Sequence, residues 1–422
     1  MTATTLHHRL EMPRFRARLT RGAVARAIVH RAVGGMPVRV TYPDGTVVGG
    51  GGDGAPTLQV LRPGSLFERL ESHPKIGLGE AYMAGDWRAA PGTDLADLLV
   101  PFAARVARLV PKPLLAFRGV VDDRMPRHQR NTPTGSRANI EAHYDLSNDL
   151  FAAFLDETMT YSSALFDRGR PVEEQDLATA QRRKIDAILD AARVGAGTRV
   201  LEIGTGWGAL ALRAAQRGAT VTSITLSTEQ AALARQRIAE AGLADRVEVR
   251  IQDYRETTGT FDAIVSVEMI EAVGEEFWPT YFATLDRLVA DDGTVAIQAI
   301  LMEHSRFLAT RNTYGWIQKY IFPGGIIPSL KAIDDVTMRH TRLRVADVHA
   351  FGTDYAETLR RWRERFLDSW PTVARHGFDE TFRRMWEFYL AYCEAGFATR
   401  YLDVAQITFT KDATRRAAPA LA

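Results

Sequence analysis

The sequence predicts an α/β protein, with a mostly parallel sheet covered by helices on both faces and a smaller α+β domain at the N-terminus. Short apolar runs alternate with helical patterns over much of the C-terminal two thirds, as a parallel sheet requires. The first of these runs ends in a glycine-rich turn at residues 204–208. A hairpin pattern at residues 37–48 marks the separate N-terminal part.

The N-terminal elements follow from turn and strand signals. In "PVRVTYPDGTVV" (37–48), valine, threonine and tyrosine flank a Pro-Asp-Gly turn, which predicts an antiparallel hairpin. Residues 57–100 add a short strand and helices, including "GLGEAYMAGDW" (77–87). We therefore predict an accessory domain over residues 1–120, followed by a polar linker without periodicity over residues 121–137.

The second domain is expected over residues 138–422. Its first long helix is predicted at residues 174–193 by composition and spacing. The apolar runs that follow are separated by helical patterns, which predicts a mainly parallel sheet. The predicted strands are 199–204, 220–226, 247–253, 261–267, 293–300 and, near the C-terminus, 404–410.

The composition is that of an ordinary globular protein, with 422 residues, 46% of them hydrophobic and 25% charged, and a net charge of +2. Basic residues cluster nonetheless. Residues 1–31 hold seven arginines and one acid, and residues 105–130 form a second basic run. These runs fit either a solvated face or attraction to an anionic membrane surface. No nucleic-acid-binding motif accompanies them, so no nucleic acid partner is expected.

The single cysteine, Cys393, excludes an intrachain disulfide and fits a reducing compartment. No set of metal ligands is expected. No apolar run approaches the roughly 20 residues that cross a bilayer. We therefore expect a cytoplasmic protein that associates peripherally with the inner face of the cell membrane.

The glycine-rich turn is the strongest local signal of a ligand site. In "VLEIGTGWGALAL" (200–212) an apolar strand ends in Gly204, Gly206 and Gly208 before a helix begins. This spacing is not the G-x-G-x-x-G of dinucleotide enzymes. Preceded by Glu202, it resembles motif I of class I S-adenosylmethionine methyltransferases. That resemblance implies a seven-stranded sheet and favours a methyltransferase over a dinucleotide enzyme.

The strands on either side extend this site. Most folds of this class end the second strand with an acid that holds the ribose hydroxyls, but Thr225 stands there in this chain. Neutral hydroxyls and Gln230 are then expected to do that work. Gln252 and Asp253 follow the third strand, where an adenine amino group could be recognised. Asp253 alone is equally typical of a helix N-cap.

Several sequence blocks follow one another in order over about residues 138–412. They are "HYDLSNDLF" (143–151), "TYSSALF" (160–166), "LEIGTGWG" (201–208), "QDYRE" (252–256), "IVSVEMIEAVG" (264–274), "WIQKYIFPGGIIPS" (316–329) and "FGTDYAETLRRWRERF" (351–366). Together these blocks resemble the cyclopropane-fatty-acid synthase family, which includes the mycolic-acid methyltransferases. The resemblance implies an enzyme that methylates the double bond of an unsaturated acyl chain of a phospholipid, using S-adenosylmethionine.

The resemblance assigns the cofactor contacts residue by residue. Tyr161 and Ser162 would meet the methionine end of S-adenosylmethionine. The remaining contacts would come from the ends of the first three strands. They are Glu202, Gly204, Gly206, Trp207, Gly208, Thr225, Leu226, Gln230, Gln252 and Asp253.

The family is also known for a bound bicarbonate that serves as the base, in a pocket made by a Cys, a Glu, a His, an Ile backbone position and a Tyr. In this chain the matching positions are Ser163, Glu271, Gln298, Ile300 and Tyr355, so the Cys and the His are replaced. Both replacements can still donate a hydrogen bond to bicarbonate. Alternatively, Glu271 is an ordinary helix carboxylate and Tyr355 only packs an interface.

These departures suggest which product forms. Methyl transfer to an alkene leaves a carbocation, which closes a cyclopropane if the new methyl loses a proton at once. If a hydride shifts first, the same proton loss gives an exocyclic methylene. Because two groups around the base differ, we expect the 10-methylene branch, related to 10-methylstearate and tuberculostearic acid, with a separate reductase and a homodimer by family analogy.

Three alternatives stay open. The first is a cyclopropane-fatty-acyl-phospholipid synthase. The second is a non-catalytic lipid- or cofactor-binding protein, against which the retained Glu271 and Tyr355 argue. The third is a methyltransferase of a soluble polar substrate, although the apolar block "YIFPGGIIPS" (320–329) fits an acyl tunnel better.

Overall fold

The computed structural model describes residues 23–109, 126, 131–132, 135 and 148–414. Most of the predicted linker (121–137) and most of both basic runs therefore lie outside the described residues. No helix in the part of the chain that the structure describes is long and apolar enough to cross a membrane.

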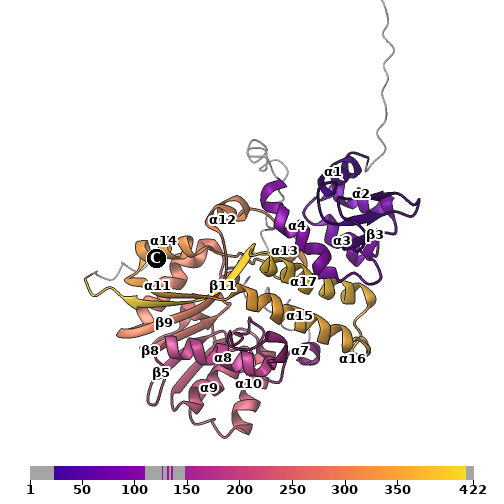
Figure 1. The fold of residues 1–422 in the computed structure, drawn as a ribbon. Coiled ribbons are helices and arrows are strands. Elements are labelled where there is room, and N and C mark those ends of the chain that lie inside the picture. The colour runs from indigo at the N-terminus through magenta and orange to yellow at the C-terminus, as the bar shows by residue number, and fades with distance from the viewer. Residues whose placement is uncertain (1–22, 110–125, 127–130, 133–134, 136–147, 415–422) are drawn as a thin grey trace, which may run out of the picture.

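The N-terminal part forms a small four-stranded sheet with helices, drawn in indigo and purple in Figure 1. The strand order is β2-β1-β3-β4, and the predicted hairpin is confirmed, because Val40 pairs with Val48 in an antiparallel register. The elements are α1 (Ala23–Val33), β1 (Arg39–Thr41), β2 (Val47–Val48), β3 (Thr57–Val60), α2 (Pro63–Ser72), α3 (Gly77–Met83), β4 (Trp87–Ala89) and α4 (Leu95–Leu109).

The second part carries a seven-stranded sheet in the order β10-β11-β9-β8-β5-β6-β7, which confirms the predicted fold class. The pairs from β9 to β7 are parallel, whereas β11 runs antiparallel to both β9 and β10. The strands are β5 (Arg199–Ile203), β6 (Thr220–Thr225), β7 (Val247–Ile251), β8 (Phe261–Val267), β9 (Val289–Met302), β10 (Leu343–Ala350) and β11 (Leu402–Lys411).

Helices connect and cover these strands. The predicted helix at 174–193 is present as α8 (Leu177–Ala191), with Asp176 as its N-cap. The α-helices are α7 (Asn148–Phe154), α8, α9 (Ala209–Gln216), α10 (Thr228–Glu240), α11 (Trp278–Leu288), α12 (His304–Thr310), α13 (Trp316–Tyr320), α14 (Leu330–His340), α15 (Gly352–Asp368), α16 (Trp370–Arg375) and α17 (Glu380–Ala398). Short 3₁₀ turns lie at η3 (Val172–Glu174), η4 (Tyr254–Glu256), η5 (Ile270–Ala272) and η6 (Glu275–Phe277).

The central strands of the sheet are buried on both faces, which explains why they are apolar runs without alternation. On β5, Val200 belongs to the apolar core formed with α8, α9 and α10, whereas its neighbour Leu201 belongs to the core formed with α11 and α14. On β8, Ala263 and Ile264 divide between the same two cores. The carboxyl ends of these strands are therefore the open edge at which a ligand can bind.

The two parts of the chain share a third apolar core, in which α17 packs against α3 and α4. Figure 1 shows these N-terminal helices beside the yellow α17. Tyr82, Trp87 and Phe388 pack there in tilted and edge-to-face contacts, with the ring centroids of Tyr82 and Trp87 4.9 Å apart. Buried Arg363 on α15 reaches Asp94 at 2.9 Å and Glu394 at 3.0 Å. The predicted accessory domain therefore packs directly on helices of the second part.

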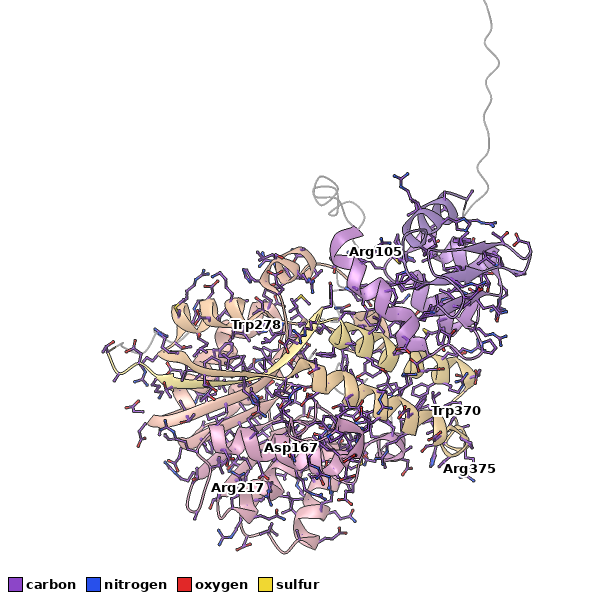
Figure 2. The ribbon with its side chains drawn as sticks, viewed as in Figure 1. Arg105, Asp167, Arg217, Trp278, Trp370 and Arg375 are labelled. Atoms are coloured by element: carbon purple, nitrogen blue, oxygen red, sulfur yellow. The ribbon has the colours of Figure 1, made fainter. Side chains whose placement is uncertain are left out.

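Arg105 is the member of the second predicted basic run whose side chain the structure describes (Figure 2). It lies on α4, and its guanidinium lies against the backbone of Gly35. This arginine is partly buried within the N-terminal part, so at this position the basic run contributes to packing rather than to a free surface.

Candidate active site

A cavity lies at the carboxyl ends of β5, β6 and β8, where ligands of open α/β sheets bind. The glycine-rich turn lines this cavity, and so do residues 159–162 and the middle of α8 at Lys184 and Ile185. All of the predicted cofactor residues except Gly208 line it. They are Tyr161, Ser162, Glu202, Gly204, Gly206, Trp207, Thr225, Leu226, Gln230, Gln252 and Asp253.

The glycine-rich turn needs glycine for two different reasons. Gly204 has φ +98°, and a Cβ there would approach Met269 Cγ to 3.0 Å, so a side chain would strain the turn and crowd the cavity wall. Gly208 has φ +88° and begins α9. A Cβ on Gly208 would lie 3.2 Å from Ala234 Cβ, so this glycine allows close helix packing and is outside the cavity lining.

One end of the cavity offers neutral polar groups. Thr225 Oγ1 donates to Gln230 Oε1 at 3.2 Å and accepts from the Ser227 N–H at 3.2 Å. This places the predicted hydroxyl and amide side by side at the end of β6. Asp253 also lines the cavity, caps η4 through the Arg255 N–H at 2.9 Å and pairs with the Arg255 guanidinium at 3.3 Å. Asp253 is therefore both an N-cap and a cavity residue.

The other end contains a buried lysine. Lys184 on α8 donates to Ser162 Oγ at 2.6 Å, and burial lowers its pKa to about 8. Tyr161 is held by a 2.8 Å hydrogen bond between its hydroxyl and that of Tyr389. Burial raises the pKa of Glu202 to about 8, although Ser223 donates to its carboxylate at 2.5 Å. Ser162, Lys184 and Glu202 are all buried, and burial strengthens electrostatic interactions.

The structure supports the fit of S-adenosylmethionine to this cavity by its shape and its chemistry. The glycine turn leaves room that a Cβ at Gly204 would fill. Hydroxyl and amide groups suited to ribose and adenine line one end, and the Tyr161–Ser162 segment lines the other. The cavity is continuous between these two ends, as a nucleoside joined to an amino acid requires.

A second cluster adjoins the cavity and is centred on Glu268, which the sequence analysis did not single out. The Ser163 N–H and the Gln298 amide donate to Glu268 Oε1 at 3.0 and 2.9 Å. The Tyr355 hydroxyl donates to Oε2 at 2.7 Å. Three of the five predicted pocket residues therefore meet at one carboxylate. Glu268 itself lines the cavity, and the three donors lie behind it.

The other two predicted pocket residues meet each other. The Ile300 N–H donates to Glu271 Oε1 at 2.5 Å, and Glu271 Oε2 is buried with no hydrogen-bond partner among the described residues. The backbone carbonyl of Glu271 accepts from the Ile326 N–H at 2.9 Å, so the predicted apolar block 320–329 adjoins the backbone of this residue.

The two carboxyls differ in their surroundings. Burial, followed by the charge of Glu268, raises the pKa of Glu271 to about 8, which favours its protonated form at neutral pH. Burial also raises the pKa of Glu268, but the donors from Ser163, Tyr355 and Gln298 and the charge of Lys184 lower it. Neighbouring carboxyls whose environments differ in this way can take different protonation states.

Lys184 and Glu268 are two ionisable cavity residues that sequence reasoning missed. Glu268 carried a signal, since an acid directly after an apolar strand lies at the ligand-binding edge of a parallel sheet. Its φ of +49° adds a second sign, because a non-glycine residue in this region costs about 1–2 kcal/mol. Lys184 lies within a helix pattern that gives no indication of its burial.

Among the described residues, no group of three His, Cys, Asp or Glu side chains could hold a metal ion. The site itself brings two carboxyls, a lysine, a tyrosine hydroxyl and backbone N–H groups together around a cavity that fits a nucleoside.

Comparison with known proteins agrees with the predicted family. A family model described as mycolic acid cyclopropane synthetase matches residues 131–407. The tuberculostearic acid methyltransferase UfaA1 of Mycobacterium tuberculosis is 51% identical over 405 residues, covering 95% of this chain and 94% of its own length. The cyclopropane-fatty-acyl-phospholipid synthase of Escherichia coli is 34% identical over 368 residues, covering 84% of this chain and 87% of its own length.

A solved structure is similar as well. The mycolic acid cyclopropane synthase CmaA1, complexed with SAH and CTAB, has a TM-score of 0.59 and 30% sequence identity. The match covers 68% of this chain and 99% of that chain. The fold and the cofactor class expected from the glycine-rich turn are therefore those of the solved relative.

Proposed function

This chain belongs to the mycolic acid cyclopropane synthetase family, and on that premise we propose that it methylates an unsaturated acyl chain of a phospholipid to give a 10-methylene product. It is an S-adenosylmethionine-dependent methyltransferase of fatty acyl chains. The observation that carries the choice of product is the 51% identity to a tuberculostearic acid methyltransferase over nearly the full length. The identity to a cyclopropane synthase is lower, at 34%.

The cofactor cavity supports a division of roles along its length. We assign the ribose and adenine to Thr225, Gln230, Gln252 and Asp253, because these neutral and acidic acceptors line one end. When bound, S-adenosylmethionine supplies an electrophilic methyl on a sulfonium. Tyr161 and Ser162 line the opposite end, which suits the methionine portion.

The remaining residues provide what alkene methylation needs. An alkene is a weak nucleophile, and its attack on the methyl leaves a cation on the acyl chain. Glu268, on the cavity wall, supplies negative charge within a water-poor site, where such charge stabilises a cation strongly. The apolar block 320–329, which adjoins Glu271, is the proposed wall of the acyl channel.

The test of this function is product identification. The protein is incubated with oleoyl phospholipid and methyl-labelled S-adenosylmethionine, and the fatty acids are analysed by mass spectrometry after release. We expect a 10-methylene chain, which a separate reductase would convert to the 10-methyl chain. A cyclopropane as the sole product would overturn the proposed product, and no label transfer would overturn the activity.

We also propose that the N-terminal basic residues hold the enzyme on the inner membrane face. Phospholipid substrate and seven arginines within residues 1–31 support this. Since α1 begins at Ala23 and Val33 is buried, the informative variant removes only residues 1–22. We expect weaker binding to vesicles that contain anionic lipid, and unchanged binding would contradict the assignment. The homodimer remains a proposal by family analogy, to be tested by sedimentation.

A further inference from the structure

The residues that match the family's bicarbonate pocket already bind an anion that belongs to the chain. The carboxylate of Glu268 accepts from the Ser163 N–H at 3.0 Å, from the Gln298 amide at 2.9 Å and from the Tyr355 hydroxyl at 2.7 Å. A carboxylate and bicarbonate share a planar group with two oxygen acceptors and one negative charge. Glu268 therefore satisfies the donors that a bound bicarbonate would need.

The remaining members of that pocket are also engaged. The Ile300 N–H donates to Glu271 Oε1 at 2.5 Å. Ser163 directs its hydroxyl to its neighbour, because Oγ donates to the Ala164 carbonyl at 2.9 Å. A second anion would have to bind beside Glu268, where like charges repel each other and the donors are used. The residues present therefore do not fit a bound bicarbonate.

The donors are also placed to hold one fixed carboxylate position. Ser163 and Gln298 are almost fully buried, at 0% and 1% exposure, and Tyr355 is 6% exposed. Glu268 lies between them and the cavity, and it lines that cavity together with Tyr161 and Ser162. A side chain held from behind in this way presents its carboxylate to whatever occupies the cavity.

The backbone at Glu268 is consistent with a functional demand at this position. Its φ of +49° lies in the left-handed region, where side chains are rare and glycine is favoured. Such strain is typical of residues that a site must place in one position. The Glu268 N–H donates to the Gln298 carbonyl at 2.7 Å, which fixes this residue at the end of β8.

We propose that the Glu268 carboxylate replaces bicarbonate as the base of this enzyme, so that the reaction needs no added anion. The proposal rests on the function proposed above. Oε1 accepts two hydrogen bonds and Oε2 accepts one among the described residues, so a lone pair on Oε2 remains available for a proton.

The π electrons of the alkene form a bond to the methyl carbon, the sulfur–carbon bond breaks toward sulfur, and the acyl chain becomes a cation. A hydride moves from the methyl-bearing carbon to its neighbour, which places the cation beside the new methyl. Glu268 then takes a proton from that methyl, and the C–H electrons form the exocyclic double bond. The proton on Glu268 passes to water after the product leaves.

The first experiment compares the wild-type enzyme in buffer freed of carbon dioxide with the same enzyme after bicarbonate is added. Label transfer to oleoyl phospholipid should be equal in the two conditions. A wild-type rate that depends on bicarbonate would overturn the proposal. Because that outcome still yields methylated product, it is distinct from failure of the proposed function, in which no 10-methylene chain forms in either condition.

The second experiment removes the carboxylate. Glu268→Gly suits the local φ and opens space between the three donors, so its rate should fall by about 100-fold and bicarbonate should restore it by about 10-fold. Arg193→Gly is the matched control, since Arg193 is another non-glycine residue at positive φ, +57°, on the surface. That control should keep the wild-type rate, and neither variant should lose affinity for S-adenosylhomocysteine in calorimetry.

A third variant covers the case in which Glu268→Gly does not fold. Glu268→Gln keeps the side-chain shape but removes the charge, and its rate should fall by about 100-fold without rescue, because the space stays filled. A Glu268→Gln enzyme with the wild-type rate would overturn the proposal. So would a folded Glu268→Gly enzyme that is fully active without bicarbonate, or one that is inactive and not rescued.

Discussion

The cofactor cavity and the carboxylate cluster beside it are built in opposite ways. The cavity is open, and glycines such as Gly204 keep side chains out of it. In the cluster, by contrast, Glu268 fills the space between Ser163, Gln298 and Tyr355. The first region is shaped to bind a ligand, whereas the second already contains an anionic side chain of the chain itself. From sequence alone, a cluster that contains its own carboxylate resembles a ligand pocket in which some of the binding residues have been replaced.

The largest effect is expected where the open region is filled. Gly204→Ala places a Cβ 3.0 Å from Met269 Cγ at φ +98°. We expect the affinity for S-adenosylhomocysteine, measured by calorimetry, to fall by about 100-fold, or about 2.7 kcal/mol. Gly242→Ala is the control, because Gly242 also has positive φ, +69°, but has open space around it. Equal affinity losses in both variants would show that strain, not the cavity, is responsible.

The next largest effect is expected in the carboxylate cluster around Glu268. Tyr355→Phe removes the donor to Glu268 Oε2 and keeps the ring, which stacks on Phe397 at 4.4 Å. We expect kcat to fall by about 30-fold with little change in cofactor affinity. Loss of this donor raises the pKa of Glu268 further. Because a base works in its ionised form, the loss of rate on acidification should begin at a higher pH than in the wild type.

The groups that face Glu268 and share in that titration are Lys184, which lowers its pKa, and Glu271, whose own pKa Glu268 raises. Tyr42→Phe is the control, since it removes a 2.9 Å hydrogen bond to His30 in the N-terminal part. It should leave both kcat and the pH profile unchanged. A Tyr355→Phe enzyme with lower cofactor affinity and normal kcat would place this tyrosine in the open region instead.

Most of the fold could be predicted because the parallel strands are buried on both faces and therefore read as apolar runs. The strand β10 was missed because it is an edge strand, and five of its eight residues are exposed, so hydrophobic patterning is weak there. The strand β9 was found but is longer than predicted, at 14 residues, because its first residues are partly exposed.

The same distinction applies to the site. The lining of the open cavity follows from local motifs, since a glycine turn and the ends of neighbouring strands meet at one edge of the sheet. Glu268 was missed because its donors Ser163, Gln298 and Tyr355 lie 105, 30 and 87 residues away in the chain. The position of Glu268 directly after β8 indicates an acid at the ligand-binding edge, but which donors hold its carboxylate depends on tertiary packing.

The two carboxyls can be separated by stability. The raised pKa of Glu271, about 8 against an ordinary 4.5, means that the folded state holds a proton that the unfolded state releases. The stabilisation of the folded state by this proton is fully present below pH 4.5 and is lost as the pH rises to about 8. Glu271→Gln removes this dependence. The free energy of unfolding of the variant, relative to that of the wild type, should therefore rise by about 1.4 kcal/mol per pH unit between these two pH values.

Denaturant unfolding at several pH values measures this difference. Glu248→Gln is the control, since Glu248 is exposed on β7 and the Arg250 contact lowers its pKa, so its titration lies below pH 4.5. The free energy of unfolding of this control should change with pH as that of the wild type does, from pH 4.5 to about 8. If the unfolding free energy of Glu271→Gln had the same pH dependence as that of the wild type, Glu271 would be ionised in the folded protein. Glu271 and Glu268 would then not differ in protonation.

The smallest effect returns to the open region, where Thr225 replaces the acid usual for such folds. Thr225→Val removes the hydroxyl that bonds Gln230 Oε1 and the Ser227 N–H, both at 3.2 Å. If several neutral groups together bind the ribose hydroxyls, the loss of one group should weaken S-adenosylhomocysteine binding by only about threefold, or about 0.6 kcal/mol. Thr228→Val, on the exposed start of α10, should change nothing. An affinity loss of 100-fold or more for Thr225→Val would mean that this hydroxyl alone replaces the acid that usually binds the ribose. The cofactor cavity would then depend on a single contact, as the carboxylate cluster depends on Glu268.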